Sequence, residues 1–196
     1  MPTRLDPAAL KQLFLDAHTH NKWLPQDVPD TLLNELIDVM KMAPTSFNCS
    51  PARIIFVKSK EAKERLKPLL SPPNVEKTMA APATAIIGHD MAFYDRLPQL
   101  FPAMDVRGLF VGKPEFIGMT AFRNGSLQGA YLMIAARALG LDIGGMSGFD
   151  NAKVDAEFFK DTTVKSNFLC NIGYGDPAGI RPRAPRLSFD EMAVIA

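Results

Sequence analysis

The sequence predicts a single globular domain that combines helices with buried strands. Its 196 residues, of which 47% are apolar and 22% charged, are enough for one sizeable core and few for a second domain. Short apolar runs at residues 52–57, 82–88 and 168–174 are typical of buried strands. Residues 127–141 are almost all apolar or small, which predicts a helix covered on nearly every side.

Composition excludes several classes of partner. The chain has 22 Lys+Arg against 21 Asp+Glu, a net charge of +1, and so lacks the basic excess expected of a nucleic-acid binder. Its two cysteines, Cys49 and Cys170, lie far apart without zinc-site spacing, which favours a reducing compartment. No segment reads as a secretion signal or a membrane span. We therefore expect a cytoplasmic protein with no nucleic-acid or membrane partner.

Capping signals and apolar periodicity divide the chain into further elements. Helices are expected over residues 7–18, 29–40, 61–70, 72–80 and 151–159, with the central helix beginning near Thr120. Asp6 and Asp150 are suitable N-caps, and Gly140 is suited to a left-handed cap at the end of the central helix. Strand and helix signals therefore alternate along one chain.

Three glycines, Gly144, Gly145 and Gly148, follow a short expected strand at residues 141–143. Glycines this dense lose much chain entropy on folding, so they need a structural or functional reason. One interpretation is a flat ligand lying against bare backbone amides. The other is a tight turn before the helix that Asp150 caps, since the segment matches neither the dinucleotide nor the phosphate-loop pattern.

Two polar loops allow similar alternatives. His18 and His20 suggest a metal, but His89 is the only other histidine and an ordinary loop is favoured, so we expect no metal. In the loop at residues 43–51, Ser46 and Asn48 either tie down their own backbone or contact a polar ring edge.

Two less regular stretches complete the chain. Residues 91–119 lose periodicity and gather aromatic side chains, which fits either a lid over a pocket or an irregular stretch packed on the core. Near the C-terminus, Arg181, Arg183 and Arg186 alternate with prolines. Arginine forks match phosphate oxygens, although a solvated basic tail has the same pattern.

Together these parts make up what a flavin mononucleotide (FMN) pocket needs, and the sequence resembles the FMN-dependent nitroreductase family. Within that family it is similar to the malonic semialdehyde reductases of the pyrimidine-degrading Rut pathway. The motifs behind this resemblance are Thr19-His20-Asn21, Pro44-Thr45-Ser46, Asn48-Cys49-Ser50-Pro51, Phe93-Tyr94, Thr120-Ala121-Phe122-Arg123-Asn124, Arg137-Ala138-Leu139-Gly140-Leu141-Asp142, Met146-Ser147-Gly148-Phe149-Asp150, Asn171-Ile172-Gly173-Tyr174 and Pro185-Arg186-Leu187.

The resemblance implies an α+β fold, with a central mixed sheet flanked by helices, and an intertwined homodimer with FMN in two interface sites. It places Ser46 and Asn48 at the flavin ring, and Arg186, helped by Arg183, at the phosphate. The remaining implied FMN ligands are His18, Thr19 and Asn21 in the N-terminal motif and Gly145, Met146, Ser147 and Gly148 beside the flavin N5. Asn21 and Ser147 depart from the family's usual Lys or Arg and Glu.

The implied activity is reduction of 3-oxopropanoate (malonic semialdehyde) to 3-hydroxypropanoate with NADPH or NADH, by ping-pong hydride transfer through FMN. No catalytic side chain is expected. A carboxylate substrate needs a cation, for which His20, Arg107 and Arg123 are the candidates. The alternatives are a broad-range nitro or quinone reductase and a flavin-binding protein without catalytic activity.

Overall fold

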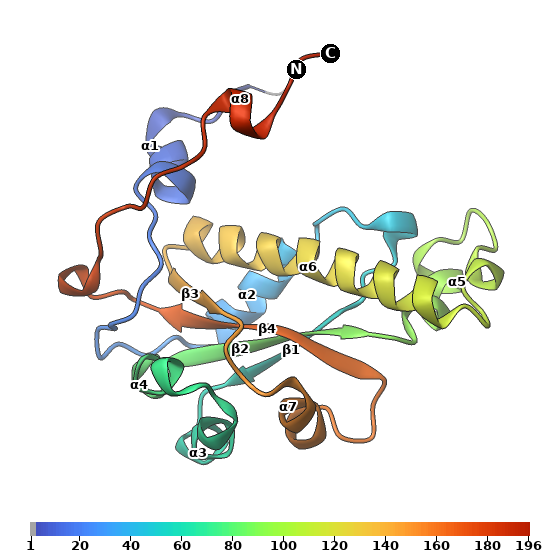
Figure 1. The fold of residues 1–196 in the computed structure, drawn as a ribbon, viewed down its shortest axis with the longest axis horizontal. Helices are drawn as coiled ribbons and strands as arrows, with labels where there is room; N and C mark the ends of the chain where they lie inside the picture. The colour runs from blue at the N-terminus through green and yellow to red at the C-terminus, as the bar shows by residue number, and fades with distance from the viewer. Residues whose placement is uncertain (1–2) are drawn as a thin grey trace.

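The computed structural model describes residues 3–196, and its centre is a four-stranded sheet with the order β1-β2-β4-β3 (Figure 1). The strands are β1 (Ala52–Val57), β2 (Ala83–Asp90), β3 (Asp142–Met146) and β4 (Val164–Gly173). All three neighbouring pairs are antiparallel, and a single bridge between Thr19 and Ile143 is parallel. The α+β class is confirmed, while the sheet expected to be mixed is antiparallel apart from that bridge.

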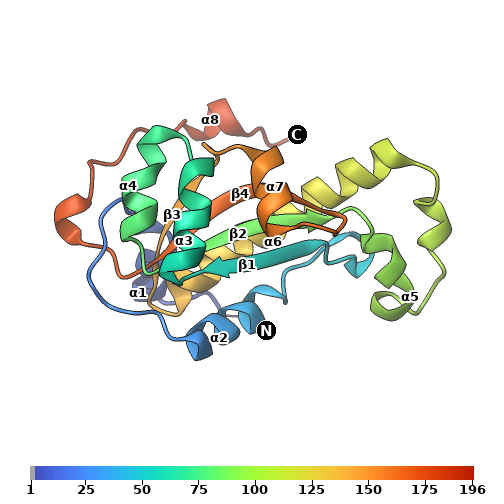
Figure 2. The ribbon, with the colours of Figure 1, turned by 90° about the horizontal axis from the view of Figure 1, so that it is seen from below.

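Helices cover both faces of the sheet (Figures 1 and 2). On one face lie α2 (Asp30–Met40) and the long α6 (Pro114–Ala138); on the other lie α3 (Lys60–Leu66), α4 (Pro72–Ala80) and α7 (Asn151–Phe158). Successive side chains of β2 point to opposite faces of the sheet. Ile87 packs in the core beneath α2 and α6, and Ile86 packs in the core beneath α3 and α7.

Short helical elements flank these layers. They are α1 (Pro7–Leu10), which continues as a π-helical turn over Lys11–Leu15, α5 (Leu97–Leu100) and α8 (Phe189–Met192). Figure 1 places α1 and α8 near one end of α6 and α5 near the other. The long helix therefore spans the distance between two separate ends of the molecule.

The local signals are confirmed at most element ends. The Asp6 carboxylate accepts a hydrogen bond from the Ala9 amide at 2.8 Å, and the Asp150 carboxylate accepts one from the Lys153 amide at 3.1 Å. Gly140 has φ +77°, the left-handed conformation that ends a helix. Strand β1 and helix α4 have the expected bounds.

Several boundaries were wrong: the first helical segment ends at Leu15 rather than near His18, and three larger differences concern the central helix and the sheet. Helix α6 begins at Pro114 rather than Thr120, because proline is favoured in the first turn of a helix. The sequence pattern missed this start because Gly118, a poor helix former, follows soon after it. Strand β3 continues through Gly144 and Gly145 to Met146, so those glycines form an edge strand and not a loop after one. Strand β4 begins at Val164, four residues before the expected start.

The aromatic stretch at residues 91–119 packs as part of a core. Phe93 and Phe110 are buried in one cluster, and the Phe110 ring stacks on that of Phe116 with centroids 5.1 Å apart. Short helical turns and the start of α6 account for much of its backbone. This packing favours an irregular stretch over a mobile lid. Among the described residues, no helix combines the length and apolarity needed to cross a membrane.

Candidate functional site

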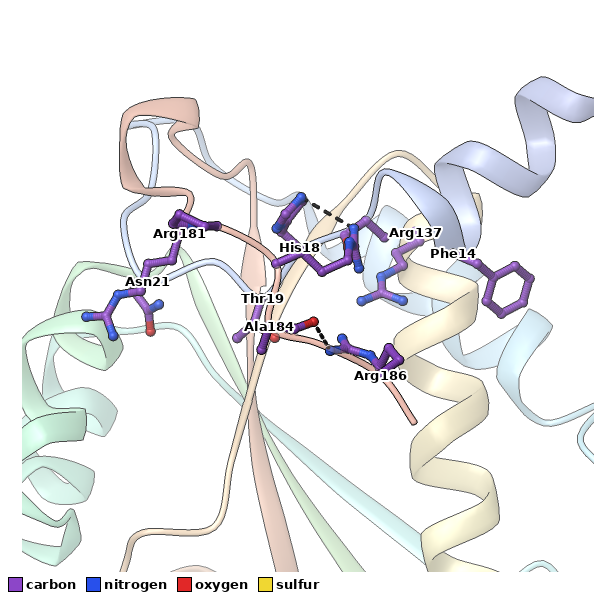
Figure 3. A pocket seen from close by; sticks show the side chains of 11 residues that line it. Phe14, His18, Thr19, Asn21, Arg137, Arg181, Ala184 and Arg186 are labelled. Atoms are coloured by element: carbon purple, nitrogen blue, oxygen red, sulfur yellow. Dashed lines mark hydrogen bonds between the residues drawn. The ribbon is translucent and has the colours of Figure 1, made fainter. Parts of the chain in front are cut away.

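A cavity of about 430 Å³ lies where the extended C-terminal segment passes the residues that follow α1 (Figure 3). Its volume is in the range of small-molecule pockets. The lining residues are Phe14, Ala17, His18, Thr19, Asn21, Arg137, Arg181, Pro182, Arg183, Ala184 and Arg186. Four arginines and a histidine are thus gathered with no carboxylate among the lining residues, and an anion such as phosphate is the chemically matched ligand.

Two of these arginines are held by backbone carbonyls at the end of the first helical segment. The Arg183 guanidinium donates to the carbonyls of Leu15 at 2.7 Å and Ala17 at 2.9 Å. Arg137, on α6, donates to the carbonyl of Leu13 at 3.0 Å. Carbonyls at a helix C-terminus lack partners within the helix, so these cations satisfy them while fixing the cavity wall. Burial lowers the pKa of Arg137.

Arg186 is placed differently. Its guanidinium donates only to the carbonyls of its neighbours Ala184 and Pro185, at 2.8 and 3.1 Å. Because these bonds are local, Arg186 is not held by another element, and its guanidinium is more available to a ligand than that of Arg183. Figure 3 shows Arg186 and His18 extending from the two chain segments that form the cavity.

The outer edge of β3 lies beside the cavity. Thr19 lines the cavity and bridges to Ile143, whose carbonyl accepts a bond from the His20 amide at 2.9 Å. In an antiparallel ladder, backbone groups two residues apart point the same way, so Gly145 also presents its N–H and C=O away from β4. Gly145 is exposed, and a bare strand edge is therefore open to a ligand.

Contacts of Gly144, Met146 and Gly148 with the rest of the protein hold this strand edge in place. A Cβ at Gly144 would lie 2.6 Å from the His20 carbonyl oxygen, so glycine permits the close approach of the two segments. Met146 is buried, and the Thr78 hydroxyl lies 3.5 Å from its sulfur. The Gly148 carbonyl accepts bonds from the Ser71 amide at 3.0 Å and the Asn74 side chain at 2.8 Å, while Ser147 remains exposed.

Ser46 and Asn48 do not join this cavity within one chain. The Ser46 amide donates to the Asn124 side chain at 2.8 Å, and the Asn48 side chain donates to the Leu100 carbonyl at 2.9 Å. Arg137 lies thirteen residues further along α6 than Asn124, which at the helical rise corresponds to about 20 Å. The residues expected at FMN therefore form two groups, one beside the C-terminal end of α6 and the other beside its N-terminal half.

The segment around Asn48 is strained. Phe47, Asn48 and Ser50 have φ values of 52°, 53° and 38°, in a region that residues other than glycine rarely adopt. Such strain is typically retained where function requires it. The Phe47 ring lies edge-on to Phe101 with centroids 5.6 Å apart, so the aromatic core helps to hold this conformation.

The three candidate substrate cations have different surroundings. His20 is 5% exposed, and its Nε2 lies 3.2 Å from the Asp142 carboxylate, so it does not line the cavity. Arg107 forms an ion pair with Asp95 at 2.7 Å and lies over the Tyr94 ring. Arg123 is exposed on α6, next to the Asn124 that holds Ser46.

Sequence reasoning did not select Arg137 and Arg181 as site residues. Arg137 was part of a family motif but was given no role, although a cation in an otherwise apolar helix needs a partner and so was a usable signal. Arg181 was seen with the basic tail but not assigned to the site. The pKa of Lys77, on α4, is lowered by burial and also by the positive charge of Arg181 nearby. Across residues 3–196, no group of three or more His, Cys, Asp or Glu side chains is arranged to hold a metal.

The sheet, the cationic cavity and the open strand edge define an α+β protein whose site is chemically suited to a flat, phosphate-bearing small molecule. A sequence profile of the nitroreductase family matches residues 16–99. The chain is 62% identical over 193 residues, 98% of its length and 99% of the relative's, to a Burkholderia lata protein named as a candidate NADH dehydrogenase/NAD(P)H nitroreductase. A similarly named protein of Ralstonia pickettii, HadB, is 56% identical over 96% of this chain and 97% of its own. The chain belongs to the nitroreductase family.

Solved structures share the fold. A candidate nitroreductase of Bacillus subtilis superposes with a TM-score of 0.85 at 22% identity, over 97% of this chain and 100% of that one. A candidate nitroreductase of Exiguobacterium sibiricum in complex with FMN superposes with a TM-score of 0.84 at 20% identity, over 100% and 99% of the two chains. At these identities the likeness establishes the fold.

Proposed function

We propose that this chain is a single-domain FMN-dependent NAD(P)H oxidoreductase. The observation that carries the proposal is the cavity in which Arg186, Arg183 and His18 converge without a carboxylate, beside the exposed edge at Gly145. Family membership supports it, as do the FMN in a structural neighbour and the NAD(P)H in the names of relatives.

The residues present fit FMN in both charge and shape. Arg186 offers a cation to a phosphate, while His18, Thr19 and Asn21 offer hydrogen-bonding groups nearby. The backbone of Gly145 and the segment through Met146, Ser147 and Gly148 would lie along the ring edge. Bound FMN would supply the redox chemistry, accepting a hydride from NADPH or NADH and giving it to the substrate.

A second copy of the chain would complete the site. Ser46 and Asn48 lie too far from the cavity to reach the same small molecule, so they would act on the FMN of a partner. The outward side of α6 supports this, because it carries exposed large apolar side chains that a second copy would cover. They are Phe116, Met119, Phe122, Leu127 and Tyr131.

For the substrate we propose 3-oxopropanoate, reduced to 3-hydroxypropanoate during pyrimidine degradation. The aldehyde carbon would receive the hydride and its oxygen a proton, so that the product is the alcohol. The branch-specific motifs support this substrate, and the exposed Ser147 would leave the ring edge without the glutamate of many relatives. A broad nitroreductase is supported by the names of the relatives and is the second candidate.

An anaerobic half-reaction assay tests the proposal. The FMN-loaded protein should be bleached by NADPH or NADH and then reoxidised by 3-oxopropanoate faster than by quinones or nitroaromatic compounds. Faster reoxidation by a nitroaromatic compound would favour the second candidate. A yellow protein that neither nicotinamide bleaches would contradict the reductase itself.

A further inference from the structure

Between Phe116 and Tyr131, Arg123 is the one charged residue on the outward side of α6. Residues that follow each other at intervals of three or four share one face of a helix. On α6 this spacing aligns Arg123 with Phe116, Met119, Leu127 and Tyr131, all of them exposed. Arg123 is therefore a cation surrounded along its own helix by apolar side chains.

Covering this stripe would leave Arg123 in need of an anion. A guanidinium removed from water without a negative partner carries a large desolvation penalty. Helix α6 contains a single acidic residue, Glu115, in its first turn, and none from Phe116 to Ala138. Glu115 lies eight residues before Arg123, about 12 Å along the helix, so no carboxylate of its own α6 is within reach of Arg123.

The position of Arg123 also links it to the second part of the proposed site. The adjacent Asn124 holds the Ser46 amide at 2.8 Å, so Arg123 lies on the same part of α6 as the segment that carries Ser46 and Asn48. Any second copy that brings Ser46 to a bound flavin ring brings Arg123 with it. The other two candidates are already engaged, His20 with Asp142 and Arg107 with Asp95.

We infer that Arg123 of one copy binds the negative charge of the substrate at the FMN of the other copy, and so selects carboxylate-bearing acceptors over neutral ones. This inference rests on the proposed function, including the second copy. It assigns Arg123 a role in substrate specificity and none in the reduction of FMN by the nicotinamide.

The test compares acceptors that differ only in charge. FMN-loaded wild type, Arg123→Gln and Arg123→Lys are assayed with 3-oxopropanoate and its methyl ester, and with 4-nitrobenzoate and its methyl ester. Arg65→Gln is the matched control, since Arg65 is an exposed arginine on α3, across the sheet from α6. Charged hydrogen bonds of this kind predict a loss of about 10- to 100-fold in kcat/KM for the acids with Arg123→Gln, mainly through KM.

The esters should change by less than about twofold, since they lack the charge that Arg123 would bind. Arg123→Lys should keep most of the preference for the acids, and Arg65→Gln all of it. Equal losses for acid and ester, or no loss, would overturn the inference. A wild type that is bleached by NADPH but shows no preference for either acid would also overturn it while leaving the reductase intact. A wild type that is not bleached would contradict the proposed function instead.

Discussion

The C-terminal end of α6 and its N-terminal half have surroundings that differ in how they are built. At the end near Ala138, basic side chains from separate segments, among them Arg137 and Arg186, surround a cavity. Beside the N-terminal half, Ser46 and Asn48 lie on a short strained segment that is held by Asn124 and by aromatic rings. The first region is defined by charge, whereas the second is defined by backbone conformation and packing. Variants that affect one region should leave the other largely intact.

The largest effect on stability is expected from Asn124→Ala. Asn124 is buried, accepts a bond from the Ser46 amide at 2.8 Å and donates one to the Thr120 carbonyl at 2.8 Å. Its loss leaves a partly buried amide without its partner, which predicts a decrease of about 2 to 3 kcal/mol in the free energy of unfolding, measured by urea denaturation of the apoprotein.

Asn167→Ala is the control, because Asn167 lies on β4 and its side chain bonds to the same helix. It removes only the bond from the Asn167 side chain to the Ser126 hydroxyl, for which about 1 kcal/mol is expected. Equal losses for the two variants would show that Asn124 has no special role in holding the Ser46 segment.

Two adjacent glycines of β3 should respond differently to alanine. Gly144→Ala would place a methyl group 2.6 Å from the His20 carbonyl oxygen, which predicts a loss of about 2 kcal/mol as the two segments move apart. At Gly145 the nearest atom to a Cβ is the Met133 sulfur at 3.5 Å, so Gly145→Ala should fold with nearly unchanged stability. Thermal unfolding of both variants measures the difference, and similar melting temperatures would be evidence against the close approach at Gly144.

Arg186→Ala probes the charged end. Because Arg186 donates only to its neighbours Ala184 and Pro185, its removal should hardly affect folding. FMN binding should weaken by about tenfold, or about 1.4 kcal/mol, since a charge-assisted contact to the phosphate is lost. Fluorescence titration gives Kd. Riboflavin, which lacks the phosphate, should bind wild type and variant alike, and an equal loss for both ligands would refute the phosphate assignment.

The smallest effect concerns His89, which is buried between β2 and α6 and packs edge-on to Phe122. Burial lowers the pKa of His89 in the folded state, with the charge of Asp155 opposing that shift. The unfolded state then binds the proton more readily, so this contribution is fully present above the ordinary histidine pKa and decreases as the pH falls below about 6.5.

His89→Gln should therefore lose less stability than wild type between pH 7.5 and pH 5.5, as measured by urea midpoints. Parallel decreases in wild type and His89→Gln would mean that another group causes the acid sensitivity.

The sequence was most informative where a single residue type determines the structure. Asp6, Asp150 and Gly140 were predicted as caps because each satisfies or ends a helix by local geometry. The start of α6 was missed because Gly118 interrupts the apolar pattern that Pro114 begins. Local patterns therefore identified the elements better than their boundaries.

The site was predicted in part for a related reason. The family resemblance, together with charge and glycine content, pointed to Arg183, Arg186 and the glycines of β3, but it gave Arg137 no role. No pattern in one chain shows that Ser46 lies about 20 Å along α6 from Arg137, because that distance depends on tertiary structure. The division of the site became evident only from the fold.

Complementation between two defective chains tests most directly whether two copies build each site. Arg186→Ala and Asn48→Ala chains are co-expressed with different tags, and the heterodimer is isolated and titrated with FMN. If each site takes Arg186 from one chain and Asn48 from the other, one of the two sites in the heterodimer is intact, and about half of the sites should bind FMN with wild-type affinity. A heterodimer in which every site binds FMN as weakly as in the parent variants would contradict this account.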